Sequence, residues 1–76
     1  MNKERRKELK VVVSKLEEAY DRLDAIIADE EEAYDNMPEG LQQSERGTSM
    51  EDGIYSMKDA LENIDDIKLS LEDMLM

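Results

Sequence analysis

Apolar residues recur at alternating spacings of four and three along both halves of the chain, and a polar segment separates the halves. In the first half this stripe comprises Leu9, Val13, Leu16, Tyr20, Leu23, Ile27, Glu30, Tyr34 and Met37. In the second half it comprises Met50, Ile54, Met57, Leu61, Ile64, Lys68, Leu71 and Leu75. This spacing places each set on one face of an α-helix. The pattern predicts an all-α fold, an antiparallel two-helix hairpin with a short helical turn in the connection.

Capping signals and the single proline predict the bounds of these elements. Asn2 is a capping residue before a first helix over residues 3–35, and Pro38 ends that helix because the residue before a proline disfavours the helical region. We expect a connecting loop with a short helical turn over residues 36–47, which stops at Gly47. The sequence Thr48-Ser49-Met50-Glu51 has capping-box spacing and predicts a second helix over residues 49–75. Residues 1–76 then form one helical-hairpin domain.

The hairpin has a predicted register, in which the numbers of facing residues sum to 84. Leu9 then faces Leu75, Ile27 faces Met57, and the chain folds back near Gln42. Basic residues gather at the start of the first helix, and the acidic end of the second helix lies beside them. Basic residues at a helix start and acidic residues at a helix end are each unfavourable in the field of their own helix dipole. We expect the two groups to attract each other across the hairpin and so to offset this effect.

A further apolar stripe accompanies each half and favours assembly. It comprises Val12, Ala19, Ile26 and Ala33 in the first half and Gly53, Ala60, Ile67 and Met74 in the second. Three apolar positions in seven suit a helix in a bundle of three or more. A core of this size supplies only ~3–5 kcal/mol, and no cysteine is present for a disulfide. We therefore expect the hairpin to oligomerise into a helical bundle.

Two charged residues interrupt the predicted seam between the helices. Glu30 and Lys68 occupy positions that should be apolar, and polar seam residues often set register or oligomeric state. In the predicted register they lie ~21 Å apart along one hairpin, which is too far for an ion pair. They either meet across a dimer or reach solvent individually.

Charge narrows the choice of partners. The chain carries 21 Asp and Glu against 10 Lys and Arg, a formal net charge of −11. This charge repels nucleic-acid backbones and anionic membranes, so we expect neither as a direct partner. A basic host protein remains open as a partner, with the chain as its inhibitor or as a mimic of nucleic acid. The predicted docking face consists of acidic residues of both helices: Glu17, Glu18, Asp21, Asp24, Glu31, Glu32, Asp59, Glu62, Asp65 and Asp66. Plain solubility explains the charge equally well.

The sequence offers no basis for catalysis or for a bound cofactor. It contains neither His nor Cys, no phosphate-binding glycine loop, and no serine with a base nearby. The acidic runs lack the alternating spacing and the glycine of a calcium loop. We predict a protein that is not an enzyme and has no cofactor and no metal site.

The connection between the helices is the candidate ligand site. Arg46 precedes the predicted start of the second helix, where free N–H groups, the positive end of the dipole and the Thr48 and Ser49 hydroxyls favour an anion. Further candidate contacts are polar or aromatic side chains of the connection and the helix ends: Tyr34, Asn36, Gln42, Ser44 and Tyr55. The plainer interpretation is that these polar residues are helix caps and turn residues, and that Arg46 pairs with Glu45 or Glu51.

The same segment resembles a known group of proteins. The sequence Tyr34-Asp35-Asn36-Met37-Pro38-Glu39, followed by Leu41-Gln42 and Ser44-Glu45-Arg46, is similar to the loop of short acidic helical-hairpin proteins of phages and prophages. The resemblance implies a non-enzymatic, phage-linked protein in the cytoplasm of a bacterial host cell. By analogy with compact phage proteins that act as oligomeric sponges, it suggests an anti-defence protein that sequesters a nucleotide-derived immune signal.

Three hypotheses of function follow. The leading one is a homo-oligomeric sponge that holds a small anionic nucleotide at the loop. The second is an acidic inhibitor or nucleic-acid mimic that binds a host protein. The third is a structural oligomer without a ligand.

Overall fold

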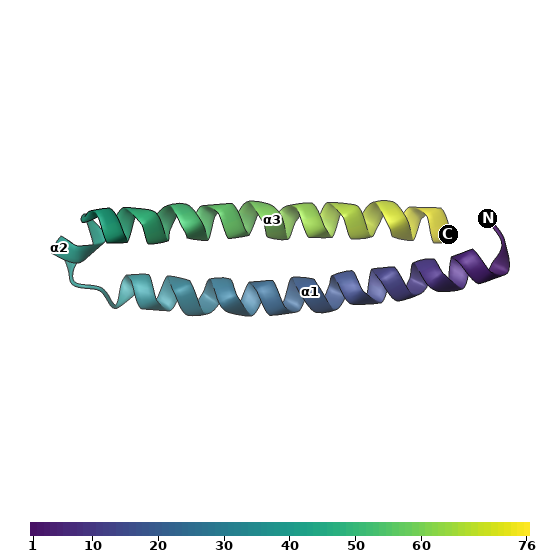
Figure 1. Ribbon diagram of the computed structural model, residues 1–76, viewed down its shortest axis with the longest axis horizontal. Coiled ribbons are helices and arrows are strands. Elements are labelled where there is room, and N and C mark those ends of the chain that lie inside the picture. The colour runs from purple at the N-terminus through teal and green to yellow at the C-terminus, as the bar shows by residue number, and fades with distance from the viewer.

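Two long antiparallel helices dominate the structure, a computed structural model that describes all residues from 1 to 76. Helix α1 spans Lys3–Asp35, the short α2 spans Glu39–Gln42, and α3 spans Glu45–Leu75. Figure 1 shows α1 and α3 side by side, with α2 at one end and both termini at the other. The molecule is a rod with principal extents of 58 × 14 × 14 Å. The predicted all-α hairpin with a helical turn in the connection is therefore confirmed.

The seam between α1 and α3 consists of the predicted stripes. Every residue of both stripes is buried or half-buried, and the most buried side chains are Val13, Ile27 and Ile54. Fully burying such an aliphatic side chain contributes ~1.5–3 kcal/mol. With only three buried apolar side chains, one hairpin holds a small core.

Two contacts between α1 and α3 agree with the predicted register. Glu17 pairs with Lys68 at 3.8 Å, and the Tyr34 hydroxyl donates to Glu51 at 2.9 Å. Each contact lies within one residue of the facing pair expected from the sequence. At the open end of the hairpin, the Arg6 guanidinium donates to the Leu75 carbonyl at 2.6 Å. This bond satisfies a carbonyl of the last turn of α3 with a basic residue from the start of α1.

The predicted bounds of α1 are correct. The Asn2 side chain accepts a hydrogen bond from the Arg5 N–H at 2.8 Å, which caps the first turn. The helix ends at Asp35, three residues before Pro38, and the Met37 N–H donates to the Tyr34 carbonyl at 3.1 Å. Pro38 is the N-cap residue of α2, with φ −55° and ψ 144°.

The predicted start of the second helix at residue 49 is wrong. The α3 helix begins at Glu45, because Ser44 caps it and accepts from the Gly47 N–H at 3.4 Å. Thr48 already lies inside the helix, and its N–H donates to the Ser44 carbonyl at 2.9 Å. The connection between the long helices is therefore shorter than the predicted 36–47.

Gly47 lies within the first turn of α3 and does not terminate a helix. It is buried, and a Cβ atom there would lie 2.5 Å from the Leu41 carbonyl oxygen and closer still to that of Gln42. The backbone of α2 rests directly on α3 at this point. The absence of a side chain at position 47 permits the tight connection.

Candidate functional site

The loop segment predicted to bind a ligand is engaged largely in hydrogen bonds of its own. The Gln42 amide donates to the Tyr34 carbonyl at 2.8 Å. The Ser44 hydroxyl donates to the Leu41 carbonyl at 2.5 Å while it caps α3. Asn36 follows the last residue of α1, and its backbone N–H donates to the Glu32 carbonyl at 3.0 Å. These bonds favour the capping interpretation for the side chains of Gln42 and Ser44, whereas the bond of Asn36 involves only its backbone.

Arg46, Thr48 and Ser49 are exposed on α3. Arg46 forms no ion pair, in contrast to the predicted pairing with Glu45 or Glu51. Its side chain borders a shallow, mostly apolar depression of about 260 Å³ with Ala33, Met37, Leu41 and Met50. Because α3 begins at Glu45, the free N–H groups of its first turn lie ahead of Thr48 and Ser49, beside a carboxylate at position 45.

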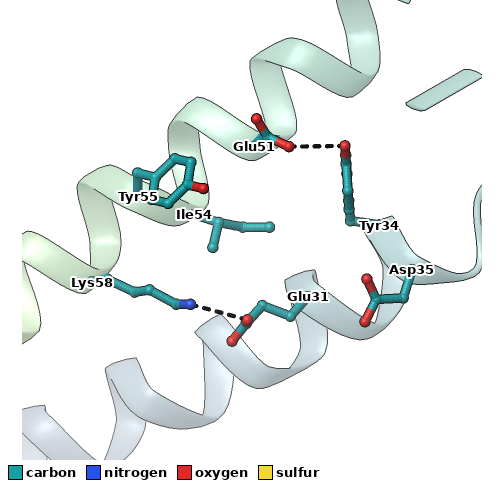
Figure 2. Close-up of a pocket in the computed structure, with 7 residues that line it drawn as sticks. All are labelled: Glu31, Tyr34, Asp35, Glu51, Ile54, Tyr55 and Lys58. Atoms are coloured by element: carbon teal, nitrogen blue, oxygen red, sulfur yellow. Dashed lines mark hydrogen bonds and ion pairs between the residues drawn. The ribbon is translucent and has the colours of Figure 1, made fainter. Parts of the chain in front are cut away.

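Tyr34 and Tyr55, which are also predicted ligand contacts, line a groove across the seam that does not include Arg46. The groove of about 180 Å³ is lined by Glu31, Tyr34, Asp35, Glu51, Ile54, Tyr55 and Lys58. Figure 2 shows Tyr34, Glu31 and Asp35 coming from α1, while Glu51, Ile54, Tyr55 and Lys58 come from α3. The structure therefore separates Tyr34 and Tyr55 from Arg46.

Electrostatics make this groove acidic. Lys58 pairs with Glu31 at 3.1 Å, which leaves the carboxylates of Asp35 and Glu51 without a cationic partner. The hydrogen bond to Glu51 raises the pKa of the Tyr34 phenol above its ordinary value of 10.0, and desolvation and the negative charges of Glu51 and Asp35 add to the rise. The phenol thus stays protonated as a donor. A groove of this charge suits a cation better than a phosphate.

A second polar groove lies on the same side of the hairpin, nearer its open end. It has a volume of about 330 Å³ and is lined by Glu17, Tyr20, Asp21, Asp65 and Lys68. Lys68, one of the two charged seam residues, keeps 24% of its side chain exposed and pairs with Glu17 and Glu72 within the same chain. Glu30 is half-buried and forms no ion pair.

We call this side of the hairpin the acidic flank. It is defined by the carboxylates that line the two polar grooves: Glu17, Asp21, Glu31, Asp35, Glu51 and Asp65. The predicted acidic docking face already contains Glu17, Asp21, Glu31 and Asp65, whereas it lacks Asp35 and Glu51. The pattern also signals the flank, because its residues Glu17, Glu31, Glu51 and Asp65 each follow a seam residue, on the edge away from the additional apolar stripe.

The opposite side is the apolar flank, defined by the additional stripes, Val12, Ala19, Ile26 and Ala33 on α1 and Gly53, Ala60, Ile67 and Met74 on α3. Each of these residues immediately precedes a seam residue, and in an antiparallel pair such positions lie on the same side. Two hollows confirm this placement. One joins Val12 to Met74 at the open end, and the other joins Ala33 to Arg46 at the loop end.

All eight residues of the apolar flank are exposed, and its four large side chains keep between 44% and 54% of their surface accessible.

None of the three helices combines the length and apolar character that a membrane crossing requires. No group of three or more acidic side chains is arranged to hold a metal ion.

Comparisons of the chain with protein-family models, with curated proteins and with solved structures found no match. The resemblance of the loop to phage proteins therefore stays a prediction.

Proposed function

We propose that this protein is a non-catalytic binding module, which assembles as a homo-oligomeric helical bundle and binds a basic surface of a partner protein. The apolar flank is the assembly surface, and the acidic flank is the binding surface. The observation that carries this proposal is the division of the hairpin into these two flanks, one lined by carboxylates and one by exposed apolar side chains.

The negative charge is concentrated at the loop end. In the predicted register, residues 22–62 form the loop half of the rod, and they carry twelve Asp and Glu against three Lys and Arg. Residues 1–21 and 63–76 form the open half, with nine Asp and Glu against seven Lys and Arg. The loop half therefore has a net charge of −9 and the open half of −2.

The charge density of the loop half approaches that of a nucleic-acid strand. Half of the 58 Å rod carries nine net charges, about one per 3 Å of length. One strand of DNA carries one charge per ~3.4 Å. Such a surface attracts basic proteins over distances of about a Debye length, ~8 Å at physiological salt.

Most of this charge is free to act on a partner. The four ion pairs engage only Glu17, Glu18, Glu31 and Glu72 among the 21 acidic residues. The groove between Tyr34 and Tyr55 adds specificity, because Tyr55 is 60% exposed and offers a ring face beside the unpaired Glu51 carboxylate. Arg and Lys side chains bind such combinations through ion pairing and cation–π contact.

Charge variants with matched controls test this proposal. The loop-half variant Asp35→Asn, Glu51→Gln removes the two carboxylates of the acidic flank in that half that form no ion pair. The control Asp66→Asn, Asp73→Asn makes the same change of net charge in the open half, at exposed residues outside the acidic flank.

The immobilised protein is tested for retention of a panel of purified basic proteins, including nucleic-acid-binding domains, at low and high salt. We expect salt-sensitive retention that the loop-half variant loses and the control keeps. Equal retention by both variants would show that net charge, and not this surface, governs binding.

The hypothesis of a nucleotide sponge at Arg46 stays a prediction. The exposed Arg46 beside an apolar depression is compatible with it, whereas the neighbouring Glu45 and the self-bonded polar side chains do not favour it. Calorimetry with cyclic nucleotides and ADP-ribose derivatives, with Arg46→Ala as control, tests it separately.

A further inference from the structure

We infer that the apolar flank binds a second copy of this chain in an antiparallel, two-fold symmetric dimer, so that the loop end of each hairpin lies over the open end of the other. This inference deepens the proposed function, on whose assembly surface it rests, by giving the partner, the orientation and the facing residues. In this dimer α1 packs against the partner's α1 and α3 against the partner's α3, which forms a four-helix bundle.

The alternation of large and small side chains on α1 fits this orientation. With the two-fold axis near residues 22 and 23, Val12 faces the partner's Ala33, and Ala19 faces the partner's Ile26. Each layer then pairs one large side chain with one small one, as close packing requires.

The stripe on α3 also pairs one large side chain with one small side chain in each layer, although its two small residues precede its two large ones. Gly53 faces the partner's Met74, and Ala60 faces the partner's Ile67. The α3 residues along the border of the apolar flank stand four positions before the four residues of its stripe. All of these border residues are uncharged: Ser49, Ser56, Asn63 and Ser70. In a chain with 41% charged residues, an uncharged border favours close approach of a partner helix.

The alternative dimer, with both loops at the same end, packs poorly. It places α1 against the partner's α3, so that Val12 meets the partner's Met74, and Ala33 meets the partner's Gly53. One end would then be overfilled and the other left with a void, and both faults destabilise an interface.

The distribution of charge also favours the antiparallel dimer. In the antiparallel dimer each loop half of −9 faces an open half of −2, whereas the alternative places −9 against −9. Within α1 the facing halves attract, because residues 1–18 carry six basic and four acidic side chains and residues 19–35 carry one basic and seven acidic side chains. At the border, Lys15 of one protomer lies near the partner's Asp29.

The area available is sufficient for a stable dimer. A flank 58 Å long and 14 Å wide offers about 800 Å² per protomer, the size of a standard specific interface. Leu41, which is 52% exposed at the loop end, lies over the partner's hollow of about 360 Å³ lined by Leu9, Val12 and Met74. The acidic flanks stay outside the bundle and are available to partners.

A swap of side-chain size tests the facing pairs directly, with light scattering and sedimentation as the measure of dimerisation. Ala19→Ile overfills the layer and Ile26→Ala empties it, so each single variant weakens the dimer by about tenfold or more. The double variant Ala19→Ile, Ile26→Ala restores one large and one small side chain in each layer, and we expect it to recover dimerisation. All substituted positions are exposed in the hairpin, so helical circular dichroism of the monomer is retained.

Cysteine pairing tests the orientation independently, since the chain contains no cysteine. Oxidation of a mixture of Ala19→Cys and Ile26→Cys protomers is expected to give the mixed disulfide, because those positions face each other. Each variant alone gives little, since its two copies lie ~10 Å apart along the axis.

A mixture of Ala19→Cys and Ile67→Cys protomers reports the alternative dimer. Cross-linking of that mixture, a dimer that gives neither product, or a monomer at all concentrations would overturn the inference. The binding proposal fails separately: an antiparallel dimer without salt-sensitive retention of basic proteins refutes the binding surface alone.

Discussion

Replacement of Gly47 by alanine tests the tight connection between α2 and α3. The added Cβ would lie 2.5 Å from the Leu41 carbonyl oxygen and 2.5 Å from the Gln42 carbonyl carbon, and closer still to the Gln42 oxygen. These atoms belong to the backbone, which cannot move aside as a flexible side chain does. We expect α2 to shift away from α3.

The two opposing effects can be weighed. Alanine in place of glycine inside a helix is worth up to ~1 kcal/mol in favour of folding. Overpacking costs ~1–3 kcal/mol, and displacement of α2 strains the bond from Gln42 to the Tyr34 carbonyl, worth ~1 kcal/mol. The clash therefore wins, and we expect Gly47→Ala to lower the free energy of unfolding by ~1–2 kcal/mol.

Gly53→Ala is the matched control. Gly53 lies in the same helix and its φ is not positive. Apart from the adjacent helix backbone, no atom lies within 4 Å of a Cβ built there. This variant should gain ~0.5–1 kcal/mol from helix propensity and reduced entropy of the unfolded chain. Opposite signs in the two variants would separate the local clash from the general effect of glycine in a helix.

Thermal and urea denaturation followed by circular dichroism measure both effects, with ~4–8 °C in Tm for each kcal/mol. Measurements at two protein concentrations separate association from folding, because Gly53 lies on the apolar flank. If Gly47→Ala proves as stable as the natural sequence or more stable, the close contact between α2 and α3 does not exist as described.

Three further predictions concern the cap, the core and the tyrosine. Ser44→Ala removes the cap of α3 and should cost ~1 kcal/mol in a denaturation experiment, whereas the same change at the exposed Ser56 should cost less than ~0.5 kcal/mol. Ile27→Ala, at a side chain only 3% exposed, should cost ~2–4 kcal/mol, and full retention of stability would contradict the seam. The Tyr34 phenol should titrate above 10.0, seen as the difference in phenolate absorbance between the natural chain and Tyr34→Phe, and Glu51→Gln should lower that pKa. Because the folded-state pKa is raised, the contribution of this hydrogen bond to stability is present below pH 10.0 and is lost as the pH rises through the raised value.

The candidate site could be predicted only in part from the sequence. Tyr34 and Tyr55 were selected for their aromatic rings, and both line one groove, but their neighbours Glu51 and Lys58 were not selected. Glu51 and Lys58 stand seven residues apart on α3, and only the pairing of α3 with α1 brings them to Tyr34 and Glu31. Arg46 was grouped with the tyrosines because it is near in sequence, yet it borders the opposite flank.

The 4-3 spacing by itself determined which residues of each helix form the seam, because helical periodicity assigns each residue to a face without reference to any partner. The Asn2 cap and the end of α1 before Pro38 were likewise local, since backbone groups within a few residues satisfy them. Tertiary structure decided where α3 begins. Two capping signals, at Ser44 and at Thr48-Ser49, compete in the sequence, and the earlier one prevails because Gly47 allows α2 to pack against the first turn of α3. Tertiary structure also decided the contrast between the acidic and apolar flanks, because the side of a hairpin on which a residue lies depends on how two distant helices are paired.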